Sequence, residues 1–408
     1  MIRKTNLMTL IGSSGLSNLA DGIYQITLPL LALTVTRDPA AFASVAFFSR
    51  LPWLLVALPA GVLADRLDRR RTMVVVNISR ALMIGALAAF VGTGLQSLWP
   101  LYVAAFTLGI AETLFDTAAQ SILPTVVEDP ERLSLANGRL HATELIANQF
   151  IGPPLGALLV GVALAGALIT SSATYLVAAA ALATMTGRHR PHRPGPRTPL
   201  RTDLVDGVRY LVHHRLLRVL GLCVGISNLA STGMIAILPL YVIAPGTVAL
   251  SAAGYGLLLV TIAAGQVSGT ALTPMLERRL GPKRTMLFAT AGFPLFSLGP
   301  ALTANPVWLA AVFFAAGAVS ISWNIITVSV RQRIVPNSML GRVNAGYRLV
   351  AWGTIPLGAA LGGLVAHRYG LTTTFWVATA ISATCFPLIA FGTSSDDLAA
   401  GRQAAIGR

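Results

Sequence analysis

Charged side chains are scarce in this sequence. Only 11% of its 408 residues are Asp, Glu, Lys or Arg, whereas about 25% of a soluble domain is charged. Hydrophobic residues make up 54% of the chain. The charges fall in short clusters between apolar runs of about 20 residues, and a run of that length spans a bilayer. This shortage of charge argues against a soluble enzyme and predicts that lipid is the main solvent.

Cysteine and histidine are also rare. Cys223 and Cys385 are the only two cysteines, and they lie in separate apolar runs with no CxxC spacing, so we interpret both as buried, inert thiols. The six histidines show no metal-ligand spacing, and no GxxxxGK[ST] phosphate loop occurs. We therefore expect no metal, no cofactor and no catalytic residue, and energy from an ion gradient rather than from ATP bound to this chain.

The basic residues carry a topology signal. A net charge of +15 on a soluble surface would suggest nucleic-acid binding, but the positions of these residues argue against it. If the N-terminus is inside, 26 of the 30 Lys and Arg lie in inner segments, and only Arg37 and Arg368 lie in outer loops. This asymmetry predicts a multi-pass membrane protein with both termini cytoplasmic and no nucleic-acid partner. The excess of 28 Arg over two Lys suggests a GC-rich bacterium, so we expect a bacterial cytoplasmic (inner) membrane.

Apolar segments occupy most of the chain. They lie at 8–36, 41–64, 72–93, 98–124, 142–163, 166–187, 215–244, 252–276, 284–303, 307–330, 343–366 and 371–392. A membrane β-barrel needs short alternating segments, whereas these runs are long and continuous. The pattern therefore predicts an all-α membrane protein with twelve transmembrane helices.

One long polar stretch, 188–214, divides these helices six and six. Its first part is rich in proline and is expected to be a semi-rigid linker, and its second part is typical of an amphipathic helix on the membrane face. The predicted organisation is an N-terminal six-helix bundle at 1–187, this cytoplasmic linker, a C-terminal six-helix bundle at 215–392 and a cytoplasmic tail at 393–408.

An internal repeat supports the division. SNLADGIYQITLPL at 17–30 recurs as SNLASTGMIAILPL at 227–240, and RLDRRRTM at 66–73 recurs as RLGPKRTM at 279–286. We interpret the halves as two homologous six-helix bundles with the same orientation, related by a pseudo-two-fold axis along the membrane normal. Such repeats predict a substrate path between the bundles.

These segments resemble a known superfamily. GVLADRLDRRRTM at 61–73 resembles the signature loop of the major facilitator superfamily, and the resemblance covers essentially the whole chain. SRLPWLLVALPAGVLADRLDRRR, the NISRA around Arg80 and ERLSLANGRLHATELIANQFIGPPLGALL resemble the exporter branch that includes enterobactin exporters and macrolide efflux proteins. The resemblance implies export of a drug or metabolite. GPPLGA at 152–157 also resembles a fifth-helix Gly-Pro motif associated with antiporters.

Two groups of residues are predicted to serve conformational change. Small residues permit close helix approach, so Gly61 in the signature loop and the Gly152, Pro153 and Gly156 motif are expected at packing interfaces. The loop also places charges at a cytoplasmic helix junction, where they would latch the two halves; alternatively, its arginines only set topology. The charged loop residues are Asp65, Arg66, Arg69 and Arg70.

Three acids lie within predicted spans. An ionisable group at bilayer depth is costly and suggests a functional site. Asp21 and Glu112 fall near the midplane from a rise of about 1.5 Å per residue, and Asp116 shares a helix face with Glu112. The repeat places Ser231 opposite Asp21, so the shared frame does not explain this acid. We predict proton coupling or substrate binding for Asp21 and Glu112; cation recognition or a buried ion pair are alternatives for Asp21.

Two arginines lie within spans as well. Arg80 and Asp116 lie at similar depths, about 12 Å from the cytoplasmic helix ends, and are predicted to form a structural ion pair. Arg50 is grouped with Asp21 and Glu112 as a candidate proton-coupling or substrate residue. Its side chain either extends toward these acids or snorkels to the outer water, and the sequence favours neither interpretation.

The sequence therefore predicts a secondary transporter, with proton-coupled efflux of a small amphipathic drug, metabolite or siderophore by alternating access. Its partners would be this substrate, protons and the lipid bilayer, and the chain is expected to be monomeric. An uptake symporter on the same fold and a transport-inactive receptor or scaffold are the alternatives, because residue chemistry does not determine the direction of transport.

Overall fold

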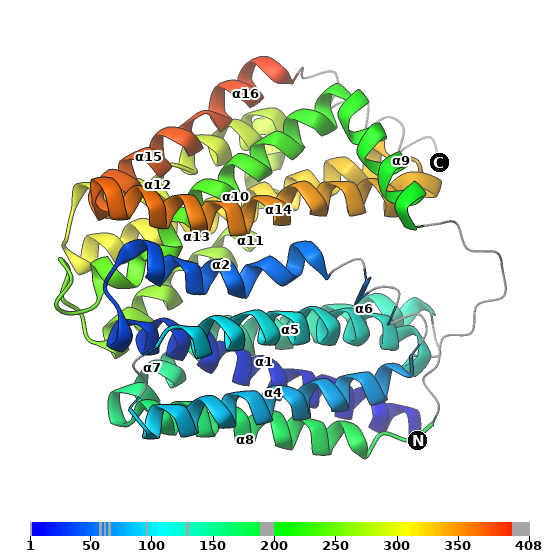
Figure 1. Ribbon diagram of the computed structural model, residues 1–408. Helices are drawn as coiled ribbons and strands as arrows, with labels where there is room; N and C mark the ends of the chain where they lie inside the picture. Colours follow the sequence, from blue (N-terminus) through cyan, green and yellow to red (C-terminus); the bar gives the residue numbers. More distant parts are fainter. Residues whose placement is uncertain are drawn as a thin grey trace. The chain divides into compact units, whose positions relative to one another are not determined.

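The computed structural model describes residues 2–56, 59–60, 63, 67–94, 97–127, 130–187 and 200–393. These residues form helices and short connections, with no β-strand among them (Figure 1). Nine helices in this part of the chain are long and apolar enough to cross a membrane, and Pro39–Leu55 is a shorter apolar helix. The prediction of an all-helical membrane protein is confirmed.

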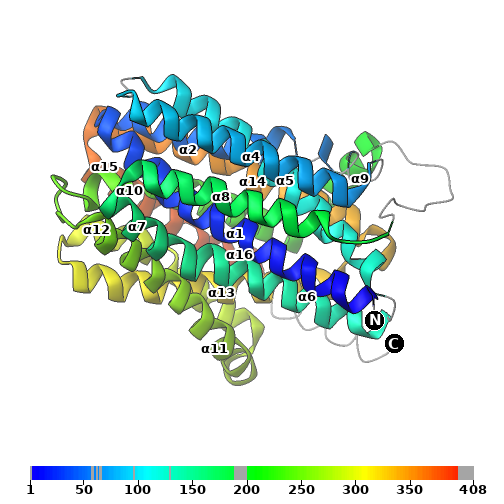
Figure 2. The same ribbon diagram turned by 90° about the horizontal axis from the view of Figure 1, so that it is seen from below.

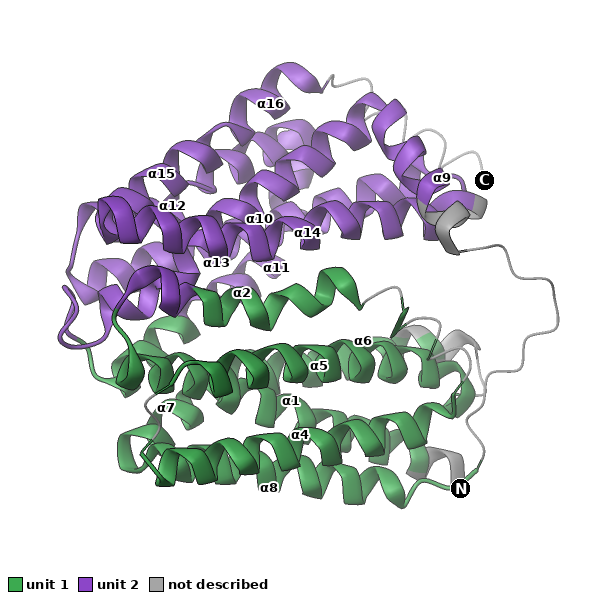
Figure 3. Cartoon of the chain, viewed as in Figure 1, with its two compact units in different colours: residues 1–37, 44–195, 250–260 green, residues 38–43, 196–249, 261–408 purple. Residues whose placement is uncertain are grey.

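The chain forms two compact units, which Figure 3 distinguishes by colour. Unit 1 comprises residues 1–37, 44–195 and 250–260, and unit 2 comprises 38–43, 196–249 and 261–408. The helices of unit 1 are α1 (Ile2–Val35), most of α2 (Pro39–Leu55), α4 (Arg69–Gly92), α5 (Trp99–Val126), α6 (Pro130–Leu145), the π-helix η1 (Ile146–Ile151), α7 (Gly152–Val162) and α8 (Leu164–Ala183).

Helix α8 packs against both α1 and α4 in unit 1, and Figure 2 shows it running beside α1. Two adjacent serines of α8 make these contacts. Ser171 Oγ donates a hydrogen bond to the carbonyl oxygen of Ala20 in α1 at 2.9 Å, and Ser172 Oγ donates to that of Ala81 in α4 at 2.7 Å. Small side chains let membrane helices approach closely, and interhelical hydrogen bonds hold them together. This packing brings the polar side chains of α1 against α4.

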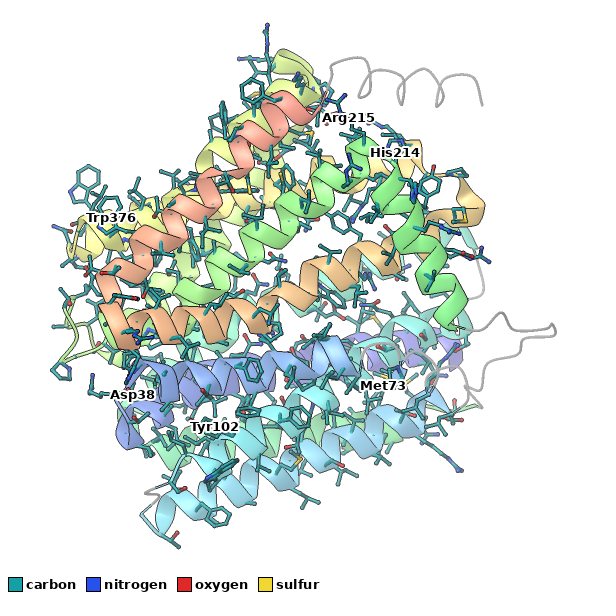
Figure 4. The ribbon with its side chains drawn as sticks, turned by 45° about the horizontal axis from the view of Figure 1, so that its top comes forward. Asp38, Met73, Tyr102, His214, Arg215 and Trp376 are labelled. Atoms are coloured by element: carbon teal, nitrogen blue, oxygen red, sulfur yellow. The ribbon has the colours of Figure 1, made fainter. Side chains whose placement is uncertain are left out.

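Unit 2 contains the remaining helices. They are α9 (Leu200–His213), α10 (Arg215–Val242), most of α11 (Ala252–Gly292), α12 (Leu295–Leu302), α13 (Pro306–Ile334), α14 (Asn337–Tyr369), α15 (Leu371–Ala383) and α16 (Cys385–Gly392). Figure 4 shows His214 and Arg215 where α9 meets α10. Helices α10 and α14 cross at glycines: a Cβ at Gly358 would lie 2.3 Å from the carbonyl oxygen of Leu229.

Helix α11 is two helices joined at a kink. Gly281 has a φ of 77°, a left-handed conformation that glycine adopts without steric cost, and Pro282 follows it. The two predicted segments 252–276 and 284–303 lie on either side of this kink and together form the apolar stretch Ala252–Leu302. A break in direction between two spans therefore falls in the repeated RLGPKRTM segment.

Candidate functional site

A buried ion pair lies between the first and third helices of unit 1. Asp21 of α1 and Arg80 of α4 are joined by Arg80 Nη1 and Asp21 Oδ2 at 3.3 Å. The Arg80 side chain is 0% exposed. The other carboxylate oxygen, Asp21 Oδ1, accepts a hydrogen bond of 2.5 Å from the Tyr175 hydroxyl of α8. Side chains of three helices thus meet in a single buried polar centre.

Aromatic rings surround the guanidinium of Arg80. Its central carbon lies 5.3 Å from the ring centre of Phe115 and 5.2 Å from that of Tyr175, distances at which a cation is attracted to a ring face. Arg80 Nη1 also donates to Ser17 Oγ at 3.3 Å. Its Nε and Nη2 atoms have no hydrogen-bond partner among the described residues. One carboxylate and two ring faces therefore hold this charge away from water.

This arrangement differs from the predicted pair of Arg80 and Asp116. The structure pairs Arg80 with Asp21 instead, and it shows no ion pair between Arg80 and Asp116 within its described part. For Asp21, a buried ion pair is one of the alternatives that the sequence left open, and the structure shows that pair. Helical rise places residues at the right depth, but rotation about each axis decides which neighbour a side chain meets. Arg80 faces α1 and α8. It therefore pairs with Asp21 and not with Asp116, although the sequence places Arg80 and Asp116 at similar depths.

A small cavity brings together the three residues predicted for proton coupling. Its volume is about 20 Å³, enough for about one water molecule. It is lined by Asp21, Tyr24 and Gln25 from α1, Ser49 and Arg50 from α2, and Leu108, Gly109 and Glu112 from α5. Glu112 has no hydrogen-bond or ion-pair partner within the residues that the structure describes. Asp21 is thus bonded at both of its carboxylate oxygens, whereas the Glu112 carboxylate has no such partner among the described residues.

Tyr175 was missed by the sequence reasoning. It lies in an apolar segment of α8. The sequence of such a segment does not distinguish a tyrosine that donates to a buried charge from a tyrosine that only packs. A hydroxyl buried in lipid or in a helix bundle needs a hydrogen-bond partner, and that requirement was the available signal. Its ring is only 1% exposed, so Asp21 supplies the partner that water cannot.

The described part of the predicted gating loop contacts carbonyl groups of unit 1. Arg69 Nη1 donates to the carbonyl oxygen of Ser121 at 2.5 Å, and Arg70 Nε donates to that of Leu182 at 3.1 Å. The side chain of Asp68 caps α4 by accepting from the Arg71 amide. Cations near the C-terminus of a helix are favourable, which suits Arg70 beside the end of α8.

The other three predicted loop residues, Gly61, Asp65 and Arg66, lie outside the described residues. Their roles remain predictions.

The Gly-Pro motif packs directly beside Asp21. A Cβ at Gly152 would lie 2.6 Å from the Cα of Gly22, and one at Gly156 would lie 2.9 Å from the carbonyl oxygen of Ile23. Pro153 follows Gly152 in the first turn of α7 and is buried. The two glycines therefore let α7 contact the backbone of α1 at the two residues after the acid, and the motif helps to position Asp21.

We expect Gly152→Ala to destabilise unit 1. The added methyl meets backbone rather than a flexible side chain, and overpacking of this kind costs about 1–3 kcal/mol. Gly161→Ala is the matched control, because nothing lies within 4 Å of a Cβ at that position in the same helix. Thermal unfolding of the purified variants in detergent should show a lower midpoint for Gly152→Ala alone. Equal midpoints for the two variants would contradict the packing role.

An all-helical membrane protein with a buried ion pair and with acidic and arginine side chains at a cavity between its helices has the features of a secondary transporter. The family described as "Transmembrane secretion effector", within the major facilitator superfamily, matches residues 2–393. The chain belongs to this family.

Several curated relatives of the chain are exporters by name. The multidrug efflux pump Tap of Mycobacterium tuberculosis is 27% identical, with 94% of this chain and 90% of that protein covered. The pump of the same name from Mycolicibacterium fortuitum is 26% identical over 87% of this chain and 88% of the relative. The enterobactin exporter EntS of Salmonella choleraesuis is 28% identical over 75% and 72%. These matches confirm the predicted exporter branch of the superfamily.

Solved transporter structures share the fold. The nucleoside transporter NupG superposes with a TM-score of 0.73 at 14% identity, covering 95% of this chain and 98% of that one. A bacterial homologue of the iron transporter ferroportin, in an inward-facing state, gives 0.75 at 16% identity over 95% and 98%. At these identities the likeness concerns the fold and not the substrate.

Proposed function

We propose that this chain is a proton-coupled exporter of small amphipathic compounds that works by alternating access of two six-helix bundles. The observation that supports it most directly is the cavity of unit 1, where Asp21, Glu112 and Arg50 meet. Ionisable groups inside membrane helices mark ion pathways and proton relays. The names of the relatives, a multidrug efflux pump and an enterobactin exporter, support export over uptake.

In this proposal the two acids of the cavity have different roles. Asp21 stays ionised, because Arg80 and Tyr175 bond both of its oxygens. Glu112 has no such partners among the described residues, and its cavity has room for about one water. Glu112 therefore takes up a proton from the outside and releases it to the inside. Arg50 borders the same cavity and interacts with the ionised form of Glu112 more favourably than with the protonated form.

Transport by inverted membrane vesicles tests the proposal. Vesicles that contain the chain should accumulate the fluorescent cation ethidium, or members of a panel of antibiotics and siderophores, when a proton gradient is applied. Collapse of the gradient with a protonophore should stop accumulation, and substrate addition should release protons from the vesicle interior. Accumulation by right-side-out vesicles alone would indicate an uptake symporter, and no transport by either would indicate a receptor or scaffold.

We further propose twelve transmembrane helices with both termini cytoplasmic. Ser97 lies between α4 and α5 and is exposed, and we expect it on the outer side. A Ser97→Cys variant should therefore react with a membrane-impermeant maleimide added to intact cells. Asn137→Cys, on exposed α6 in a predicted cytoplasmic segment, is the matched control and should react only after the cells are opened. The reverse pattern would invert the proposed topology.

A further inference from the structure

A second and larger cavity lies inside unit 2. Its volume is about 220 Å³, and it is lined by residues of α10, α11, α12, α13 and the junction between α11 and α12. The polar side chains on its wall belong to Ser227, Asn228, Ser231, Gln266 and Ser320, and two phenylalanines, Phe293 and Phe296, face it as well. None of the described residues that line it is an Asp, Glu, Lys, Arg or His. This cavity is polar but carries no charge.

The internal repeat relates this cavity to the charged one. The common SNLA frame places Ser231 at the position of Asp21. Two glycines give a second point of correspondence, because each presses against a carbonyl oxygen of the second helix in its half. A Cβ at Gly109 would lie 2.5 Å from the Ser49 oxygen, and a Cβ at Gly317 would lie 2.1 Å from the Ile262 oxygen. Both cavities are therefore built at the same place in the two halves.

This correspondence pairs Glu112 with Ser320, since each lies three residues after its glycine. The repeated RLDRRRTM and RLGPKRTM segments likewise pair Arg80 with Phe293. Both residues of this pair lie against an aromatic ring. Phe293 packs edge to face on Trp323, with 5.3 Å between ring centres, and Arg80 lies over the ring of Phe115.

Asp21, Glu112 and Arg80 of the first half thus correspond to the uncharged residues Ser231, Ser320 and Phe293 at the second cavity. In unit 1 the Asp21–Arg80 pair occupies the interior, whereas in unit 2 the corresponding Ser231 and Phe293 leave an open space.

Several polar groups of the second cavity have no partner within the described part of the protein. The side chains of Ser227, Gln266 and Ser320 make no hydrogen bond there. Asn228 Nδ2 donates to the carbonyl oxygen of Ala351 at 2.6 Å, which leaves its amide oxygen available. Polar groups in a low-dielectric interior are costly unless they are hydrogen-bonded, so a ligand with donors and acceptors fits this wall.

We propose that the unit 2 cavity binds the uncharged, hydrogen-bonding part of the transported compound, a ring that carries amide, hydroxyl or carbonyl groups. The ring would pack on Phe293 and Phe296, and its polar groups would bond to the side-chain amides and hydroxyls. A cation would lose its hydration without meeting a carboxylate. The volume is below the roughly 300–1,000 Å³ of drug-sized pockets, so the cavity takes a fragment of the compound. Only the identity of the ligand as the transported compound rests on the proposed function.

Protection of an introduced cysteine tests this proposal. The full chain with Ser231→Cys is reacted with N-ethylmaleimide in lipid nanodiscs. The native cysteines are 0% exposed in the structure, so we expect the reaction at the introduced cysteine. Three probes of similar size are compared at equal concentration: benzamide is neutral and polar, benzylammonium is charged, and toluene is apolar. At ~5 mM, a probe with a Kd of ~1 mM slows alkylation about sixfold by mass action. We expect this slowing from benzamide and less than twofold from the other two.

Two controls make the result specific. Ser97→Cys lies on an exposed loop outside the cavity, and benzamide should leave its alkylation rate unchanged. Adding Gln266→Leu to Ser231→Cys removes an amide that makes no bond within the described residues, and it should abolish protection by benzamide.

Equal protection by toluene would show an apolar void, and equal protection by benzylammonium would refute the ligand class. Protection by none of the three would refute the site. If benzamide protects but vesicles show no proton-driven transport, the proposed function fails and this cavity assignment stands.

Discussion

Glu112→Gln is expected to abolish uphill export while leaving downhill exchange of substrate intact. The amide has the size of a protonated glutamate and cannot release a proton, so movement of the carrier is no longer tied to the proton gradient. For an uncharged substrate, one proton moving through ~100 mV supplies about 2.3 kcal/mol, which sustains a concentration ratio of about 50-fold. That ratio should fall to about one in vesicles that contain the variant. Substrate-induced proton movement should disappear as well.

The matched control is Glu144→Gln, the same substitution on α6. Glu144 does not line the unit 1 cavity; it lies 3.4 Å from His141. Its vesicles should accumulate substrate as the native protein does. If Glu112→Gln still drives uphill export and Asp21→Asn does not, then Asp21 carries the proton in spite of its two bonds.

Asp21→Asn is expected to destabilise the protein strongly, because it leaves the Arg80 guanidinium buried without a counter-charge. Removal of one partner of a buried ion pair typically costs about 3–5 kcal/mol. The double variant Asp21→Asn with Arg80→Met replaces the pair by uncharged groups and should recover most of the loss. Thermal unfolding midpoints and yields of the purified single and double variants measure both effects.

Asp116→Asn provides the opposing test for this ion pair. Asp116 forms no ion pair with Arg80 within the described residues, so its amide should cost less than Asp21→Asn. If Asp116→Asn lowered the stability and Asp21→Asn left it unchanged, the result would support the Arg80–Asp116 pair that helix depth alone predicts. The structure predicts the opposite order.

Composition and hydrophobic periodicity were sufficient to predict the class of the protein, an all-helical membrane protein. The long apolar runs predict helices because a bilayer offers no hydrogen-bond partner to the backbone, and a helix satisfies its own. The repeat of SNLA at 17–20 and 227–230 indicated two related halves without any structure. The signature loop at 61–73 placed the chain in its superfamily, and the family match over residues 2–393 agrees.

The same sequence signals selected the residues of the charged site but not their contacts. Asp21, Glu112 and Arg50 stood out because ionisable groups inside spans are rare, and the structure gathers them at one cavity. Tyr175 did not stand out, because a tyrosine in an apolar run is ordinary. An unusual residue type can be read from the chain, but an ordinary residue in an unusual place cannot.

The sequence by itself determined which side chains lie at the depth of the bilayer, because depth follows from position along a helix of known rise. The tertiary structure alone decided that Arg80 meets Asp21 rather than Asp116. That choice depends on the rotation of α4 about its axis, and the rotation is set by how α8 packs on α1 and α4 through Ser171 and Ser172. Packing of this kind involves residues about 90 to 150 positions apart, which no local pattern in the chain encodes.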